Sequence, residues 1–81
     1  MDKEAISLVA GIVAQALELP VDRVQEEDAM ETIEEWDSLG HLNILVALDK
    51  KFLGKVAKIS ELSKATSVEK IAEILREHHL I

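Results

Sequence analysis

One serine, Ser38, stands where a long acidic segment gives way to a helical pattern, and it is the residue best placed for chemistry. A hydroxyl at a helix start is exposed, because the chain enters the first turn from the surface. The free backbone amides and positive dipole end of such a helix also favour a phosphate group there. A simpler role suits the same position, since either Ser38 or Asp37 could cap the helix. The spacing alone leaves both roles open.

A catalytic serine is the enzymatic alternative, and the neighbouring residues argue against it. The segment Asp37-Ser38-Leu39-Gly40 lacks the first glycine of a G-x-S-x-G elbow, and no strand precedes it. His41 follows one turn later, but a histidine there is more typical of a surface or cap position. No third group that could orient it is identifiable. We therefore expect no catalytic residue and no enzyme activity.

Two other clusters could in principle bind a metal. His78 and His79 are adjacent, whereas two histidines on one helix face need a spacing of four. The run Glu26-Glu27-Asp28 lacks the alternating oxygen ligands and central glycine of a calcium loop. We therefore expect no metal site. The two histidines are expected to lie at a solvated helix end, and the acidic run is expected to be solvated and to face partners.

The elements around Ser38 are predicted from hydrophobic spacing. A helix is expected over residues 3–17, with Asp2 as N-cap and Pro20 beyond its end. Gly11 costs this helix about 1 kcal/mol relative to alanine unless close packing requires a glycine. Residues 18–37 carry nine acids and are expected to form a long ordered loop with room for one helical turn, fastened to the core by Val21, Val24, Met30, Ile33 and Trp36. Trp36 is expected to anchor the loop and not to contact a partner, because an indole buries a large area.

A second helix is predicted over residues 38–53, with Gly54 as its stop. At 100° per residue its apolar side chains fall on two neighbouring arcs, one with Ile44, Leu45, Leu48 and Phe52 and another with Leu39, Leu42, Val46 and Leu53. A small bundle fully buries one such stripe. The second stripe is either partly exposed and suited to a partner, or buried because the helix is central.

The remaining residues complete an all-α chain. Ile59 and Leu62 suggest a short helix near residues 60–64, and Thr66-Ser67-Val68-Glu69 fits a capping box that opens the last helix at Thr66. Its buried stripe is expected at Val68, Ile71, Ala72 and Leu75. No window shows sustained period-2 alternation, so no strand is expected. The predicted class is a small four-helix bundle with three long helices, one short helix and a long loop after the first.

Length and charge limit the possible functions. Eighty-one residues fit one domain, residues 1–81, and leave little room for a deep cleft. A formal charge of −7 argues against nucleic acid, and the absence of cysteine excludes a disulfide scaffold and a thiolate site. We expect a cytoplasmic location, because no targeting segment and no apolar run long enough to span a bilayer is visible. The chain is also expected to be a monomer.

The chain resembles an acyl carrier protein. The resemblance rests on Asp37-Ser38-Leu39 opening a helix, on Ala47-Leu48-Asp49-Lys50-Lys51-Phe52 after it, and on the acidity and order of helices over nearly the whole chain. The stretch from Trp36 to Leu42 is particularly similar to freestanding carriers of specialised pathways. It implies a four-helix fold of acyl-carrier type, in which Ser38 is esterified by 4′-phosphopantetheine.

The resemblance also implies partners. A separate phosphopantetheinyl transferase would modify Ser38. The thiol at the end of the arm would hold an acyl group as a thioester, which acyl-loading and acyl-processing enzymes of fatty acid or polyketide type would use. The family's partner-contact stripe matches Leu42 and Val46, with Leu39 as the apolar residue after the serine. Electrostatic steering is expected from Glu34, Glu35 and Asp37 in the acidic segment before Ser38.

In one respect this sequence differs from the family pattern. The housekeeping carrier of fatty acid synthesis usually has acidic residues along its second helix. Here Asp49 is the one acid of residues 38–53, and Lys50 and Lys51 follow it. Residues 1–40 have a net charge of −9, whereas residues 41–81 have +2. A dedicated carrier with its own enzymes therefore fits better. An aminoacyl or D-alanyl carrier loaded by an adenylating enzyme, and an unmodified helical interaction module, stay open as alternatives.

Overall fold

The computed structural model describes residues 3–81, and all its regular elements are helical. Three α-helices, α1 (Lys3–Ala16), α2 (Ser38–Lys51) and α3 (Val68–Glu77), alternate with two 3-10 helices, η1 (Val21–Arg23) and η2 (Ser60–Lys64). Within these residues the β-structure is one isolated bridge between Ala29 and Ser67. The all-α prediction is confirmed, and the short helix expected near residues 60–64 is a 3-10 helix.

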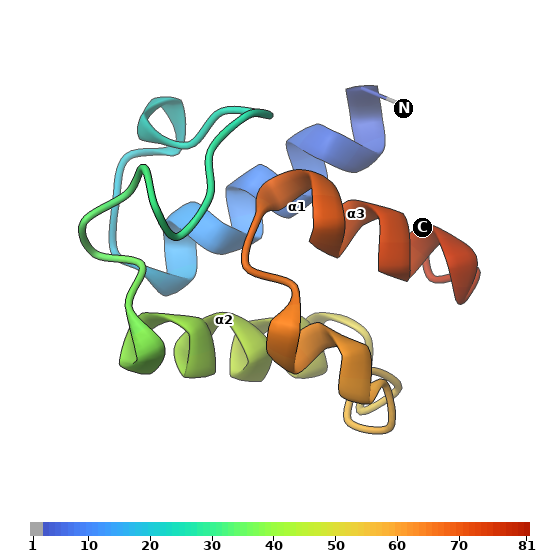
Figure 1. The fold of residues 1–81 in the computed structure, drawn as a ribbon. Helices are drawn as coiled ribbons and strands as arrows, with labels where there is room; N and C mark the ends of the chain where they lie inside the picture. Colours follow the sequence, from blue (N-terminus) through green and yellow to red (C-terminus); the bar gives the residue numbers. More distant parts are fainter. Residues whose placement is uncertain (1–2) are drawn as a thin grey trace.

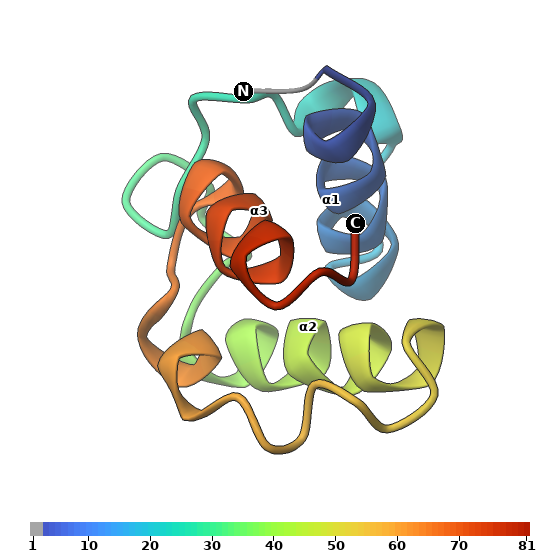
Figure 2. The same cartoon turned by 90° about the vertical axis from the view of Figure 1, so that its right-hand side faces the viewer.

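Helix α1 packs against both α2 and α3, and these two contacts hold the bundle together (Figures 1 and 2). The short η2 contacts α2 and α3 and so links the two at one end of the molecule. The core lies where these elements meet, and its most deeply buried side chains include Val9, Val13, Ile44, Leu48, Ile71 and Leu75. Among the described residues no helix is long and apolar enough to cross a membrane.

The end of α1 is set by local backbone conformation. Glu18 adopts a left-handed conformation with φ 60°, and the Leu19 N–H donates to the Ala14 carbonyl oxygen at 2.8 Å. The helix therefore stops before Pro20. A Cβ atom added to Gly11 would meet no atom within 4 Å, so close packing does not require this glycine. The expected N-cap, Asp2, lies outside the described residues.

The acidic loop between α1 and α2 is ordered by its own hydrogen bonds and by contacts with the start of α3. The Asp28 carboxylate accepts from the Gln25 N–H at 2.7 Å and from the Thr32 hydroxyl at 2.9 Å. The Val68 N–H donates to the Asp28 carbonyl oxygen at 3.1 Å. Most of the expected apolar fasteners are buried or partly buried, namely Val24, Met30, Ile33 and Trp36. Val21 is the exception, because it is exposed in η1.

The capping box predicted at Thr66 is wrong by one residue. Ser67 is the N-cap of α3, and its hydroxyl accepts from the Lys70 N–H at 3.0 Å. Position N3 is then a lysine, which has no acceptor to complete a box. The Thr66 carbonyl oxygen instead accepts from the Met30 N–H, so pairing with the loop decides where α3 begins. The predicted buried stripe of α3 is confirmed at Val68, Ile71, Ala72 and Leu75.

Candidate functional site

The start of α2 separates the roles of two neighbouring side chains. Asp37 is the N-cap, and its Oδ1 accepts from the Gly40 N–H at 2.8 Å. Ser38 is the first helical residue and is exposed, and within residues 3–81 its hydroxyl has no hydrogen-bond partner. The capping function is therefore performed by Asp37. The Ser38 hydroxyl stays free to react at a helix N-terminus, where a phosphate is favoured.

Gly40 brings the end of the acidic loop against the helix. A Cβ atom at this position would lie 2.5 Å from the Glu35 carbonyl oxygen and 2.8 Å from Leu17 Cδ2. Both distances are too short for carbon, so the approach of the loop requires glycine here. The spacing of residues in the sequence did not predict this role of Gly40. A glycine in the first turn of a helix, three residues after the cap, is the signal that could have indicated it.

His41 is buried, with an exposed fraction of 6%, which contradicts the surface or cap position expected for it. The Trp36 indole N–H donates to its Nδ1 at 3.1 Å, and its Nε2 lies 2.9 Å from the Leu62 carbonyl oxygen. A carbonyl oxygen only accepts and an indole N–H only donates, so Nε2 is the donor of the ring and Nδ1 its acceptor. The two rings also stack, with centroids 6.1 Å apart. Together they join the end of the loop, the first turns of α2 and η2.

These hydrogen bonds bear on the catalytic alternative. Both ring nitrogens of His41 are engaged, so neither is free to take a proton from the Ser38 hydroxyl. Trp36 is only 1% exposed, and its prediction as the anchor of the loop is confirmed.

The second apolar arc of α2 is exposed. Leu39, Leu42 and Val46 have exposed fractions of 67%, 54% and 48%, whereas Ile44 and Leu48 on the first arc are fully buried. The alternative in which α2 is central and buries both arcs is therefore wrong. We call Leu39, Leu42 and Val46 the exposed stripe. It begins next to Ser38, and three large apolar side chains on one helix face are typical of a contact surface.

The acidic side chains predicted to steer partners have different surroundings. Asp37 is occupied as the cap of α2. Glu35 lies 3.7 Å from the Arg23 guanidinium, with both side chains about half exposed, so the pair adds little stability. Glu34 is exposed. All three are nevertheless exposed acidic residues in the segment that directly precedes Ser38.

The other clusters singled out in the sequence serve local structure. Asp28 uses its carboxylate within its own loop. His78 ends α3 and lies 3.7 Å from the Glu61 carboxylate, while the neighbouring His79 is exposed. The described part of the chain contains no group of three or more His, Asp or Glu that could hold a metal ion.

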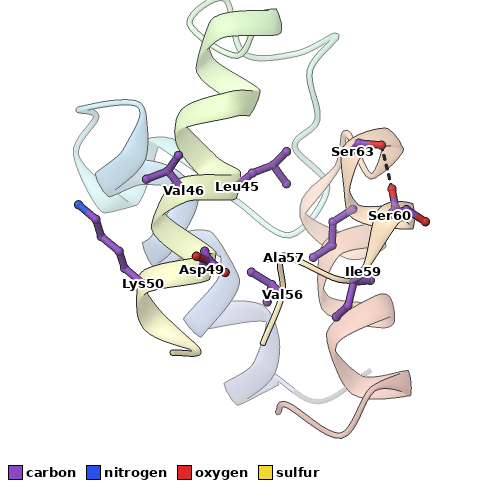
Figure 3. Close-up of a pocket in the computed structure, with 10 residues that line it drawn as sticks. Leu45, Val46, Asp49, Lys50, Val56, Ala57, Ile59, Ser60 and Ser63 are labelled. Carbon is purple, nitrogen blue, oxygen red and sulfur yellow. Dashed lines mark hydrogen bonds between the residues drawn. The ribbon is translucent and has the colours of Figure 1, made fainter. Parts of the chain in front are cut away.

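A groove lies on the side of α2 that faces the segment leading into η2 (Figure 3). Its volume is about 530 Å³, and Asp49 of α2 lines it among mostly apolar residues. The groove was not predicted from the sequence. Asp49 falls between the two apolar arcs at 100° per residue, and an acid among apolar positions was the available signal.

Comparisons of this chain with protein-family models, with curated proteins and with solved structures gave no match. Its function is therefore inferred from Ser38, from the exposed stripe and from the groove beside them.

Proposed function

We propose that this chain is an acyl carrier protein that acts through a 4′-phosphopantetheine arm on Ser38. A transferase would join the Ser38 oxygen to the phosphorus of the pantetheine phosphate in coenzyme A. The pyrophosphate bond breaks, adenosine 3′,5′-bisphosphate leaves and the serine proton passes to a base of the transferase. The thiol at the end of the arm then holds an acyl group as a thioester.

The observation that carries the proposal is the division of roles at the start of α2. A serine that served only as a helix cap would bond a backbone amide, but Asp37 makes that bond. The Ser38 hydroxyl is exposed at a helix N-terminus, beside amides that favour a phosphodiester. Trp36, His41 and Gly40 hold the backbone on both sides of it in place. These contacts present the Ser38 hydroxyl at the surface from a backbone that is held on both sides.

The exposed stripe supports the same proposal. Leu39, Leu42 and Val46 form an apolar surface that starts at the modification site, so an enzyme docked on it would meet the arm. The acidic residues of the preceding loop would attract a partner with a basic patch. In this mechanism the carrier performs no chemistry itself. It raises the effective concentration of the bound intermediate at each docked enzyme.

The charge of α2 favours a dedicated carrier over a housekeeping one. Its last turn carries Lys50 and Lys51, and Asp49 is partly buried and lines the groove. The surface of this helix therefore offers little negative charge to a basic enzyme. The partners would recognise apolar surface on α2 and negative charge before it.

The test is the intact mass of the chain after incubation with coenzyme A and a broad-specificity phosphopantetheinyl transferase. We expect a gain of one phosphopantetheine in the wild type and in Ser60→Ala, which removes another exposed serine. Ser38→Ala should gain nothing. An unmodified wild type, with the chain folded and a control carrier modified in parallel, would refute the proposal and favour an unmodified interaction module.

A further inference from the structure

The turn that ends α2 has a leucine where the backbone favours glycine. Leu53 adopts a left-handed conformation with φ 57°, and Gly54 follows it with φ 83°. The Gly54 N–H donates to the Asp49 carbonyl oxygen at 2.8 Å, and this bond closes the end of the helix. A side chain with a Cβ atom is disfavoured in the left-handed conformation, and the first such residue after a helix is usually glycine. Leu53 therefore lowers the stability of the fold.

The Leu53 side chain returns no packing to the protein. It is 86% exposed, which is more than any residue of the exposed stripe. It also lies beyond Phe52, the C-cap of α2, and so it is not part of the helix that carries that stripe. A side chain that strains the backbone and buries nothing indicates a role outside the fold.

Positive charge flanks Leu53 along the chain, since residues 50–60 contain four lysines and no acid. The four are exposed and are in no ion pair within residues 3–81, and they are Lys50, Lys51, Lys55 and Lys58. Lys50 and Lys51 lie in the last turn of α2, where they complement the helix dipole. Lys55 and Lys58 lie beyond the helix, so the dipole does not account for them. We call Leu53 and these four lysines the basic tip.

Two acids are close to the basic tip along the chain. Asp49 is partly buried, and its Oδ1 is fully enclosed by the protein. Glu61 lies 3.7 Å from His78 Nε2. The four exposed lysines exceed these two acids, so the basic tip presents a net positive charge.

The basic tip is far from the acidic loop. In both views residues 52–59 lie at the lower edge of the molecule, below α2, and residues 21–28 lie at the upper edge (Figures 1 and 2). Ser38 and Lys51 are the first and last residues of α2, so about 20 Å of axial rise separates them. This is more than twice the Debye length of about 8 Å at physiological salt. A negative surface at the basic tip would therefore interact with the lysines, while the acids before Ser38 are screened from it.

The composition of the basic tip indicates which kind of negative surface it fits. A stable protein interface buries about 800 Å² on each partner, and one leucine on a turn offers far less apolar area than that. A lipid surface needs less, because lysines pair with headgroup phosphates while a neighbouring apolar side chain enters the boundary of the hydrocarbon. The long lysine side chains can reach the headgroups from either side of the inserted leucine.

We propose that the basic tip binds the surface of a membrane that contains anionic lipids. Leu53 enters the layer between the headgroups and the hydrocarbon, and the lysines interact with the lipid phosphates. The attachment is peripheral, and it is weakened by salt because much of it is electrostatic. Ser38 and the acidic loop stay on the side away from the membrane. The inference goes beyond the proposed carrier function and does not depend on modification of Ser38.

The test is sedimentation of the unmodified full chain with sucrose-loaded vesicles. One set contains phosphatidylcholine and phosphatidylglycerol in equal parts, and the other contains phosphatidylcholine alone. We expect binding to the anionic vesicles only, with a partition coefficient that falls at least about tenfold between about 0.05 M and about 0.3 M salt.

Variants of the basic tip separate the contribution of the leucine from that of charge. Leu53→Gly should bind about tenfold more weakly, and it should melt at a higher temperature than the wild type, because glycine suits the left-handed backbone. Lys55→Gln should bind about fivefold more weakly. The matched controls lie outside the basic tip and should bind like the wild type. They are Val21→Ser, at an exposed valine of η1, and Lys70→Gln, at an exposed lysine of α3.

Three results would overturn the inference. Leu53→Gly could bind like the wild type, or Lys70→Gln could lose as much binding as Lys55→Gln, which would mean that binding follows the overall charge of the chain. The wild type could also stay in the supernatant with anionic vesicles at low salt, and an acidic protein would then be the better candidate for the partner of the basic tip. All three leave the carrier function standing, since the mass measurement tests Ser38 separately.

Discussion

Gly40 is the position where the structure makes its sharpest prediction, because a single methyl group there meets the loop that leads into Ser38. A Cβ atom at Gly40 would lie 2.5 Å from the Glu35 carbonyl oxygen, which belongs to the backbone and cannot rotate away. Gly40→Ala should therefore push the end of the loop off α2. Gly11→Ala is the matched control, since a Cβ atom there meets nothing within 4 Å.

The change in the free energy of unfolding of each variant is the sum of opposing effects. Alanine in place of glycine in a helix interior is favourable by about 1 kcal/mol, and Gly11→Ala should show that full gain. At Gly40 the clash costs about 1–3 kcal/mol. Displacement of the loop also weakens the bond between the Asp37 carboxylate and the Gly40 N–H, at a cost of about 1 kcal/mol. The net effect of Gly40→Ala is a loss of about 1–3 kcal/mol.

The assay is urea denaturation of both variants, followed by circular dichroism, together with their melting temperatures. For a domain of this size a change of 1 kcal/mol corresponds to about 4–8 °C. Gly11→Ala should melt higher than the wild type and Gly40→Ala lower. If Gly40→Ala is as stable as Gly11→Ala, the close approach of Glu35 to α2 does not exist, and Gly40 does not hold the loop against the start of this helix.

Three further substitutions test the site. Asp37→Ala should lower the free energy of unfolding, measured in urea, by about 1 kcal/mol. Asp37→Asn should retain the cap and the stability, so equal losses in the two variants would exclude a capping role. Trp36→Phe should cost about 1–3 kcal/mol, because it leaves His41 Nδ1 buried without a donor; an unchanged melting temperature would contradict the hydrogen bond. Val46→Asp should keep the helical circular-dichroism signal but slow acyl transfer to a partner enzyme about tenfold relative to Asn43→Asp. Unfolding of that variant would mean that Val46 belongs to the core.

The helices themselves could be predicted from the sequence. Their signals are local, since apolar residues recur every three or four positions and Pro20 and Gly54 lie just beyond two of the helices. The helix expected over residues 38–53 is α2, Ser38–Lys51, and the buried stripe of α3 lies at the four predicted residues. The serine at the start of α2 was also predictable, because cap residues and helix starts are encoded within a few positions.

Several details of the site depend on residues far apart in the chain. His41 is buried because its ring meets the Leu62 carbonyl oxygen, 21 residues away. The start of α3 moves to Ser67 because the neighbouring Thr66 pairs with Met30 of the acidic loop. The residue spacing around His41 does not indicate its contact with Leu62, and the spacing around Thr66 does not indicate its pairing with Met30.

The sequence by itself determined that this chain is helical, and that Ser38 stands at the start of a helix, because helix periodicity and capping are short-range properties. Only the tertiary structure decided which of the two apolar arcs of α2 is exposed, which of Asp37 and Ser38 is free, and that Asp49 lines a groove. A helix presents all its faces equally until other elements cover some of them. The packing of α1 and η2 against α2 covers Ile44 and Leu48, and it leaves Ser38 and the exposed stripe at the surface.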